Sequence, residues 1–400
     1  MQRRVLFVTW DGPQVSYLES LYLPIFGALR GHGYRFDVLQ FRWGDAGAAA
    51  ALQSRCEAVG IGYRSVGIRR WPPAVGPFLS ALLGGREVRA AFRDFGSDIV
   101  MPRSLLPALS MLAARAWRSR PVVFDADGLE ADERVEFGGL SPRSPIYRVL
   151  RAVEAEAVRR SRAVLVRAPA AIPILEDRAG PRADAPPFFV APNGRDPALY
   201  QPFSEAERHR LRRKFGIAEE VPLLVYLGSV GGKYRVDRVG ELMRHMLRLR
   251  PDTRLLVLSG SPEAARTQIC GADAELVQKS LFARVDAAEV PLHLAACDVG
   301  TMFIQPSFSM TTVAPIKLSE YLLCGVPIVG TQAVGDTAPA IAGGVFFSEE
   351  QGLEAAATWI VRDVLPARER MRTAARRVGT DHFSFDSTVA TFAQALREVS

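Results

Sequence analysis

The sequence has few of the residues that stabilise or anchor proteins outside the globular class. Its four cysteines, Cys56, Cys270, Cys297 and Cys324, show no paired spacing, which excludes a disulfide-stapled domain and predicts free, buried thiols in a reducing compartment. The five histidines show no metal-ligand spacing either. No apolar run reaches the roughly 20 residues of a membrane-spanning helix, and the apolar segment at 5–10 is too short for a signal peptide. We therefore expect a cytoplasmic globular protein.

Lysine is also scarce, and the basic charge is unevenly distributed. Among the 50 basic residues only Lys214, Lys233, Lys279 and Lys317 are lysines. Residues 1–190 hold 26 Lys and Arg against 19 Asp and Glu, whereas residues 191–400 hold 24 against 24. The whole net charge of +7 therefore lies in the first half, which suits an anionic membrane surface, an anionic substrate or nucleic acid. Nucleic acid is disfavoured, because no aromatic residues are interleaved with the arginines and no binding module is visible.

Short apolar segments alternate with segments of helical period through both halves of the chain. This alternation predicts parallel sheets covered by helices on both faces. Because 400 residues exceed one hydrophobic core, we predict an α/β protein with two doubly wound, Rossmann-like domains at 1–190 and 191–384. A last helix within 385–400 is expected to pack back on the first domain. Ligands of such sheets bind at the carboxyl ends of the strands.

The expected elements follow from the same pattern. In the first half we predict strands at 5–10, 34–41, 61–65, 98–101, 121–124 and 163–166, with helices at 17–30, 78–93, 105–117 and 146–160. In the second half we predict strands at 223–227, 255–259, 299–304, 326–329 and 346–347, with helices at 236–250, 287–296, 316–323 and 387–399.

A glycine-rich turn follows the strand at 223–227, with the sequence Gly228-Ser229-Val230-Gly231-Gly232-Lys233. Glycines allow backbone N–H groups to approach a phosphate, and the following helix N-terminus favours negative charge. Lys233 adds a point charge. The spacing matches neither a P-loop nor a dinucleotide-binding motif, so an ordinary glycine-rich turn is an equal alternative.

A polar loop at 307–312 leads into a helix at Pro315, which is a favoured residue in a first helical turn. Lys317 and Glu320 are three residues apart and share one helix face near that N-terminus. Backbone amides and Lys317 would bind phosphates, and the Glu320 carboxylate would bind two ribose hydroxyls. A surface ion pair between Lys317 and Glu320 is the alternative.

Six carboxylates follow the strand at 121–124, within residues 125–136. Burial of such a cluster without cations costs too much free energy, so we expect it to face a cleft or solvent. A local ion pair within Asp132-Glu133-Arg134 is an alternative to a functional role.

Several segments together resemble one enzyme family. The segment Pro315-Ile316-Lys317-Leu318-Ser319-Glu320-Tyr321, continued by Gly325-Val326-Pro327-Ile328-Val329, resembles the donor-binding signature of GT-B glycosyltransferases of group 1, glycosyltransferase family 4. Weaker similarities to that family are Pro192-Asn193-Gly194-Arg195-Asp196, the segment 289–300 and Phe383-Ser384-Phe385.

The resemblance implies the GT-B fold, in which two Rossmann-like domains face each other across a cleft. It implies a retaining transferase that moves a sugar from a nucleoside diphosphate sugar, bound by the second domain, to a hydroxyl of a glycan. The acceptor would be lipid-linked or belong to cell-envelope or exopolysaccharide biosynthesis, and neither a metal nor another cofactor would be required. The residues it implies are Asp127, Lys233 and Lys317 for catalysis; Gly12, Gly228, Ser229, Ser309, Thr312, Pro315, Ile316 and Glu320 for the donor; and Asp125, Glu133 and Arg134 on the acceptor side.

The chain also departs from that family. Many members carry a glutamate eight residues before the one at Glu320, where this chain has Thr312, and an arginine where it has Ser229. Trp10-Asp11-Gly12-Pro13-Gln14 replaces a Gly-Gly pair. These departures keep open a nucleotide-sugar epimerase or an inactive nucleotide-sugar-binding protein of the same fold. Asp125-Ala126-Asp127 has the Asp-x-Asp metal-binding pattern of GT-A glycosyltransferases, but that class does not explain the second half.

An apolar stretch flanked by arginines lies at 68–86 and contains Trp71. This composition suits contact with an anionic membrane surface, which would place the protein on the inner face of the cytoplasmic membrane. A buried helix with a charged rim is the alternative.

Overall fold

The computed structural model describes residues 2–12, 17–44, 46–72 and 75–399. Pro13 and Gln14 of the first loop, and residues 73–74 of the arginine-flanked stretch, lie outside this set. The chain forms two compact units. Unit 1 comprises Met1–Ala191 and Thr388–Ser400, and unit 2 comprises Pro192–Ser387.

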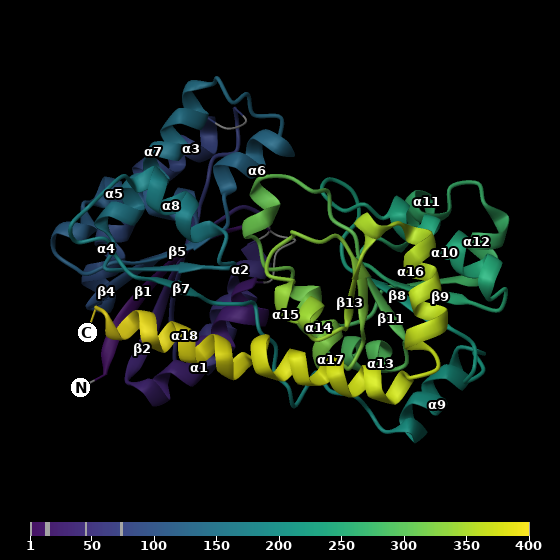
Figure 1. Ribbon diagram of the computed structural model, residues 1–400. Helices are drawn as coiled ribbons and strands as arrows, with labels where there is room; N and C mark the ends of the chain where they lie inside the picture. The colour runs from purple at the N-terminus through teal and green to yellow at the C-terminus, as the bar shows by residue number, and fades with distance from the viewer. Residues whose placement is uncertain (1, 13–16, 45, 73–74, 400) are drawn as a thin grey trace. The chain divides into compact units, whose positions relative to one another are not determined.

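Unit 1 contains two parallel sheets, with strand orders β3-β2-β1-β4 and β5-β6-β7 (Figure 1). Isolated bridges from Val100 to Val122 and from Arg103 to Asp125 continue one sheet into the other. The carboxyl ends of β1, β4, β5 and β6 therefore lie along one edge. The strands are β1 (Arg3–Asp11), β2 (Tyr34–Arg42), β3 (Gly62–Gly67), β4 (Ile99–Pro102), β5 (Val123–Asp127), β6 (Ala163–Val166) and β7 (Phe188–Val190).

Helices cover these sheets, and one expected helix is divided in two. The helix predicted at 78–93 is α3 followed by α4, with Gly84 between them. A Cβ on Gly84 would lie 2.7 Å from the Phe41 ring, and one on Gly85 would lie 2.8 Å from the backbone nitrogen of Ala114. The glycine pair therefore lets both helices pack closely on the unit, which helical periodicity alone does not reveal. The helices are η1 (Leu18–Tyr22), α1 (Leu23–Leu29), α2 (Ala46–Ala58), α3 (Val75–Leu83), α4 (Gly85–Phe95), α5 (Leu105–Ala114), α6 (Glu130–Glu136), α7 (Pro145–Arg160), α8 (Ala171–Ala179) and, from Thr388 on, α18 (Phe385–Arg397).

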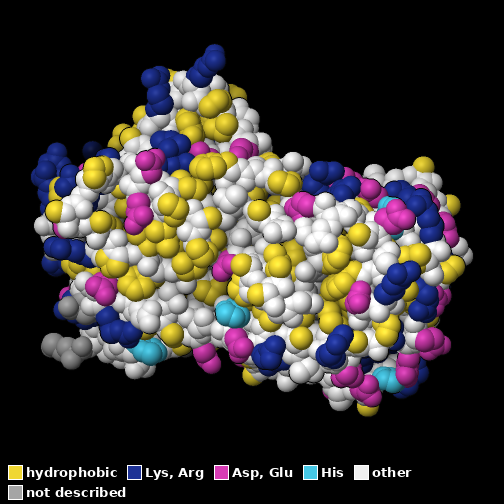
Figure 2. Space-filling model, viewed as in Figure 1, with side chains coloured by type: hydrophobic (Ala, Val, Ile, Leu, Met, Phe, Trp, Pro, Cys, Tyr) yellow, Lys and Arg dark blue, Asp and Glu magenta, His cyan; other side chains and the backbone are white. Residues whose placement is uncertain are grey.

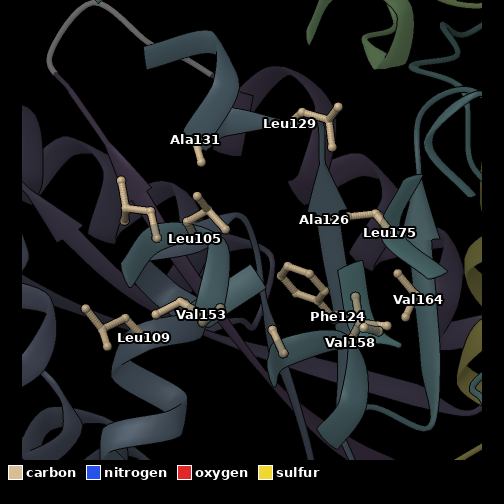
Figure 3. Packing of buried hydrophobic residues seen from close by; sticks show 14 of the residues in the cluster. Leu105, Leu109, Phe124, Ala126, Leu129, Ala131, Val153, Val158, Val164 and Leu175 are labelled. Atoms are coloured by element: carbon tan, nitrogen blue, oxygen red, sulfur yellow. The ribbon is translucent and has the colours of Figure 1, made fainter. Parts of the chain in front are cut away.

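The core of unit 1 around β5 forms where α5, α7 and α8 meet the strand (Figure 3). Phe124 of β5 is fully buried, together with Leu105 of α5 and Leu175 of α8. The last helix contributes to the same unit: the Phe392 ring lies 6.5 Å from that of Tyr22, and Arg3 Nη1 donates to the Val399 carbonyl at 3.0 Å.

Unit 2 contains a six-stranded parallel sheet in the order β10-β9-β8-β11-β12-β13 (Figure 1). The strands are β8 (Leu223–Leu227), β9 (Arg254–Leu258), β10 (Ser280–Ala283), β11 (Val299–Met302), β12 (Ile328–Gly330) and β13 (Phe346–Ser348). Its helices are α9 (Glu205–Lys214), α10 (Asp237–Leu249), α11 (Pro262–Cys270), α12 (Ala274–Lys279), α13 (Val290–Ala295), η4 (Ser309–Thr312), α14 (Ile316–Leu323), α15 (Ala338–Ala342), α16 (Leu353–Trp359) and α17 (Arg368–His382). The structure confirms β8 and α14 to the residue.

The cysteines are free and buried, as the sequence predicts. Burial raises the pKa of the Cys56 and Cys297 thiols to about 12, which leaves them unreactive at neutral pH. Within the described residues, every helix is too short or too polar to cross a membrane.

Candidate active site

The most unusual side chain of unit 2 is Lys317, in the first turn of α14. Its ammonium group is buried and makes no hydrogen bond within the described part of the chain. The nitrogen lies 4.5 Å from the ring centroid of Tyr226 and 4.8 Å from that of Tyr234. Burial lowers the pKa of Lys317 to about 7, although nearby Glu320 opposes this. Two aromatic faces only partly replace lost hydration, so the group is suited to bind an anion.

The glycine-rich turn after β8 packs directly against this ammonium group. Gly228 has φ +131, and a Cβ at this position would lie 2.9 Å from Lys317 Nζ. Only glycine permits both this backbone conformation and this close approach. The turn is held in place by the Tyr226 hydroxyl, which donates to the carbonyl of Ser229, and by Leu227 N, which donates to the Tyr321 hydroxyl at 2.8 Å. The side chain of Ser229 is exposed.

Lys233 belongs to the same turn. Its carbonyl accepts a hydrogen bond from Gln305 N at 2.7 Å, and neighbouring Tyr234 forms a bridge with Ile304. The structure therefore fixes this turn beside the segment that follows β11, and Tyr234 links it to Lys317.

Glu320 is buried one turn further along α14 and is paired with a segment distant in sequence. Its Oε1 accepts hydrogen bonds from Arg195 Nε at 3.2 Å and the Tyr200 hydroxyl at 3.1 Å. Asn193 Nδ2 donates to the Ala314 carbonyl at 2.8 Å, which fastens residues 192–200 to the start of the helix. The alternative of a surface Lys317–Glu320 ion pair is therefore wrong. Sequence reasoning missed Arg195 and Tyr200 as partners of Glu320, because no local signal reports a contact across 120 residues.

The remaining donor-side candidates lie before α14. Thr312 is fully buried in η4 and donates its hydroxyl to the Ser309 carbonyl at 2.9 Å. Ser309 is also buried. Pro315 precedes the helix and Ile316 begins it, both partly exposed, so their backbone lies at the end of the helix where N–H groups are unpaired.

In unit 1, Asp125 of β5 is enclosed by cationic and phenolic groups. Arg167, which follows β6, donates from Nη2 to both carboxylate oxygens at 2.6 and 2.7 Å. The Tyr22 hydroxyl donates to Oδ2 at 2.8 Å, and burial raises the pKa of this phenol. The prediction that the acidic cluster faces a cleft or solvent is therefore wrong for Asp125, because the neighbouring strand supplies the cation. Within the described residues, the Asp125 carboxylate accepts hydrogen bonds from Arg167 and Tyr22.

Asp127 ends β5 in a different setting. Its side chain is 32% exposed, Oδ2 accepts from Arg103 Nη2 at 2.7 Å, and Oδ1 accepts from Arg167 Nε at 3.2 Å. Its φ of +61 is unusual for a side-chain-bearing residue, and the β5–β6 register shifts here. Strained backbone of this kind is concentrated at functional sites. The result is a rigidly oriented, accessible carboxylate at the end of a strand.

The end of β1 joins the same polar cluster. Asp11 is buried and accepts hydrogen bonds from Thr9 Oγ1 and Gln40 Nε2, each at 2.9 Å. Its Oδ1 lies 3.8 Å from Arg103 Nη1. At Gly12, a Cβ would lie 2.4 Å from the Trp43 ring, so packing already requires glycine at this position.

The rest of the acidic segment lies on α6. Asp132 is buried and pairs with Arg178 Nη1 at 2.9 Å, from α8. Arg134 pairs with Glu130, one helical turn earlier, so the expected ion pair within residues 132–134 is wrong. Glu133 is partly exposed.

The two carboxylates of the Asp-x-Asp pattern are both engaged in ion pairs. Guanidinium groups hold the oxygens of Asp125 and Asp127 that a metal would need. Among the described residues, no group of three or more His, Cys, Asp and Glu side chains is arranged to hold a metal ion.

Comparison with known proteins agrees with this architecture. Residues 207–378 match the family model "Glycosyl transferases group 1". A search of curated proteins finds no match. Three similar solved structures show the fold at low identity. They are a glycosyltransferase from Rickettsia africae (15% identity, 100% of this chain and 98% of that chain, TM-score 0.72), sucrose-phosphate synthase from Thermosynechococcus elongatus (14%, 99% and 99%, 0.71), and HepE from Anabaena in complex with UDP and glucose (18%, 99% and 100%, 0.69).

The parallel sheets of both units, the glycine-rich turn packed on α14 and the family match over most of unit 2 lead to one assignment. Residues 207–378 match a domain of the glycosyl transferases group 1, and the chain has the GT-B fold of the glycosyltransferases to which it is similar.

Proposed function

We propose that this enzyme is a metal-independent, retaining glycosyltransferase that transfers a sugar from a nucleoside diphosphate sugar to a hydroxyl group of a glycan. The observation that carries the proposal is the buried ammonium group of Lys317, which has no hydrogen-bond partner among the described residues and lies beside Gly228 at the start of α14. The HepE structures that contain UDP or UDP-glucose support UDP as the first nucleotide to test.

In this proposal the diphosphate binds between the Gly228 turn and the first turn of α14. The positive end of the helix, its free N–H groups and the charges of Lys317 and Lys233 stabilise the negative charge that develops on the leaving diphosphate. Glu320 binds the donor ribose, held in orientation by Arg195 and Tyr200. Ser229, Ser309 and Thr312 of the same unit complete the donor surroundings.

The sugar transfer then follows from the position of the leaving group. The bond between the anomeric carbon and the diphosphate oxygen breaks, and the acceptor oxygen bonds to the anomeric carbon on the same face. This same-face attack retains the configuration, and the departing oxygen takes the acceptor's hydroxyl proton. Asp127 accepts a hydrogen bond from the sugar or the acceptor, because it is the exposed carboxylate of the Arg103–Arg167 cluster. Asp125 orients Arg167, and Glu133 and Arg134 lie on the acceptor side.

We expect thermal unfolding to identify the donor base. UDP, GDP and CMP are added separately in EDTA. A nucleotide at 100 times its Kd stabilises the folded state by about 2.7 kcal/mol, which raises Tm by roughly 5–10 °C in a domain of about 200 residues. A shift with one nucleotide identifies the base and supports metal independence. If no nucleotide shifts Tm in EDTA and Mg²⁺ restores the effect, metal independence is wrong. If binding occurs without sugar release or transfer, the protein is a nucleotide-sugar-binding protein.

The acceptor side of the proposal rests on α3. Trp71 is 79% exposed, and Leu79, Leu82 and Leu83 of α3 are 47%, 46% and 58% exposed. Exposed arginines flank them at positions 69, 70, 86 and 89. Figure 2 shows basic side chains beside apolar ones on the part of unit 1 that carries α3. An exposed apolar surface with a basic rim fits the interface of an anionic membrane, so we propose peripheral membrane association and a lipid-linked or cell-envelope acceptor.

Vesicle co-sedimentation tests this surface. Wild type is expected to bind phosphatidylglycerol-containing vesicles at low salt and to dissociate at high salt. The double variant Leu79→Glu/Leu82→Glu is expected to lower the bound fraction at least tenfold, because it places two negative charges in the apolar contact. Leu249→Glu, which changes a leucine of unit 2 that is 47% exposed, is the matched control. Equal binding of both variants would contradict the assignment to α3.

A further inference from the structure

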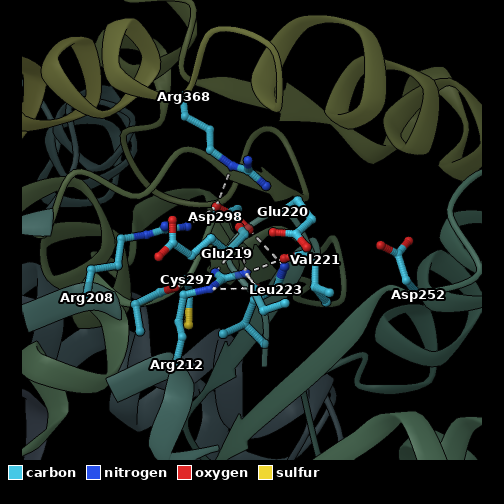
Figure 4. A network of polar contacts seen from close by, with 12 residues as sticks. Arg208, Arg212, Glu219, Glu220, Val221, Leu223, Asp252, Cys297, Asp298 and Arg368 are labelled. Atoms are coloured by element: carbon cyan, nitrogen blue, oxygen red, sulfur yellow. Dashed lines mark hydrogen bonds and ion pairs between the residues drawn. The ribbon is translucent and has the colours of Figure 1, made fainter. Parts of the chain in front are cut away.

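Three arginines, Arg208, Arg212 and Arg368, pair with one buried carboxylate in unit 2, at the edge of the sheet where the strands begin (Figure 4). A fourth, Arg372, contacts the neighbouring residue Cys297. Asp298 immediately precedes β11. Its Oδ1 accepts hydrogen bonds from Arg208 Nη2 at 2.7 Å and Arg368 Nε at 3.0 Å. Its Oδ2 accepts one from Leu223 N at 2.9 Å and lies 3.5 Å from Arg212 Nη1. The single negative charge of Asp298 is therefore shared among several guanidinium groups, and it does not neutralise all of them.

Arg212 and Arg372 differ in how many hydrogen bonds their guanidinium groups donate. Arg212 is fully buried and donates to four carbonyl groups, those of Ala218, Glu219, Val221 and Ala296, so it is a structural residue. Arg372 of α17 reaches only the Cys297 carbonyl, at 3.4 Å, among the described residues. Burial and the charge of nearby Arg208 lower the pKa of Arg372. The surroundings therefore disfavour the positive charge of this guanidinium group.

The cluster also leaves hydrogen-bond donors unused. Arg208 Nε and Arg368 Nη2 are buried and have no hydrogen-bond partner within the described residues. Each such donor destabilises the folded state, because it has lost its hydration and gained no partner. The acidic side chains nearby do not compensate: Glu219 pairs with His209, and Glu369 is exposed. The side chain of Arg368 is 27% exposed, which gives a small anion access from solvent.

We propose that Arg208, Arg368 and Arg372 form a second oxyanion site, which binds inorganic phosphate or the phosphoryl group of a small metabolite. Planar guanidinium groups bind tetrahedral oxyanions through paired N–H donors, and a dianion balances the charge that Asp298 leaves uncompensated. The bound anion would tie α9, which carries Arg208, to α17, which carries the other two arginines.

This site is separate from the proposed donor site. Leu223 begins β8 and Gly228 follows its end, so the two sites lie at opposite edges of the sheet, roughly 16 Å apart along the strand. The proposal therefore does not depend on the assignment of the donor, and the two can fail independently.

Thermal unfolding of the full chain in inorganic phosphate, against chloride at equal ionic strength, tests the second site. Saturating phosphate is expected to raise Tm by roughly 3 °C or more, in wild type and equally in Lys317→Met, which lacks the donor-site ammonium group. Arg368→Met is expected to lose this shift but keep the shift produced by the donor nucleotide, which also shows that it is folded. Arg266→Met is the control, because Arg266 is half exposed and lies in the same unit.

Three results would overturn the proposal. Wild type could show no difference between phosphate and chloride. The phosphate shift could disappear in Lys317→Met and remain in Arg368→Met, which would assign it to the donor site. Arg266→Met could lose as much of the shift as Arg368→Met, which would make the effect a nonspecific response to positive charge.

Discussion

Replacing Lys317 by methionine is expected to lower kcat/KM at least a hundredfold while making the free protein more stable. Removal of one preorganised group that stabilises developing negative charge typically costs a factor of 10²–10³. Methionine preserves the length and the apolar stem of lysine, and it packs well against the rings of Tyr226 and Tyr234.

The gain in stability follows from the pKa of Lys317. A fall from 10.5 in the unfolded chain to about 7 in the folded protein corresponds to at most about 5 kcal/mol. The unfolded lysine binds a proton throughout the range from pH 10.5 to 7 and the folded one does not. The stability of wild type therefore decreases as pH falls through this window, and methionine removes the penalty.

Kinetics and thermal unfolding at pH 7 and pH 10 test this expectation. The Tm difference between Lys317→Met and wild type is expected to be larger at pH 7. Lys214→Met, at an exposed lysine of unit 2, is the control and should change neither quantity. A variant that is both less stable and fully active would show that Lys317 is an ordinary core residue.

The same group makes donor binding depend on pH. In the free protein Lys317 has a pKa of about 7 and is mostly neutral at pH 8. A bound diphosphate raises this pKa, so Lys317 takes up a proton when the donor binds at pH 8. Calorimetry in two buffers of different ionisation enthalpy is expected to show uptake of close to one proton at pH 8, and an affinity that weakens as pH rises above 7. The Lys317→Met variant should show neither effect.

Replacing Arg167 by methionine is expected to destabilise unit 1 by about 3–5 kcal/mol, because it leaves the Asp125 carboxylate buried and unpaired. Such a loss lowers Tm by roughly 10 °C for a unit of about 200 residues. The side chain is 2% exposed and also binds the Ala191 carbonyl, at 3.2 Å. It holds one oxygen of Asp127, so kcat should fall as well.

A second substitution separates charge from packing. Arg167→Met/Asp125→Leu is expected to recover much of the lost stability, because no unpaired charge remains, whereas activity should stay low. Arg160→Met breaks an exposed pair with Glu156, and such pairs contribute at most about 1 kcal/mol. The Tm values of the three variants, measured by thermal unfolding, test this expectation. If Arg167→Met were no less stable than Arg160→Met, the buried cluster would not support unit 1.

Much of this enzyme was determined by local sequence. The alternation of apolar and helical segments specified two parallel α/β units, because period and turn residues act over a few positions. Helix α14 begins and ends where Pro315 and Gly325 predict, and Gly228 directly follows the end of β8, as the turn residues predict. Its close approach to Lys317 comes from tertiary packing.

The pairing of charges was decided by tertiary structure alone. Asp125 is buried because the neighbouring strand places Arg167 beside it, and Glu320 lies against Arg195 because residues 192–200 fold over α14. Even the division of α3 from α4 reflects how closely Gly84 approaches Phe41. Contacts of this kind depend on which parts of the chain the sheet order brings together. The strand order results from the packing of the whole chain, so it cannot be predicted from a short segment of the sequence.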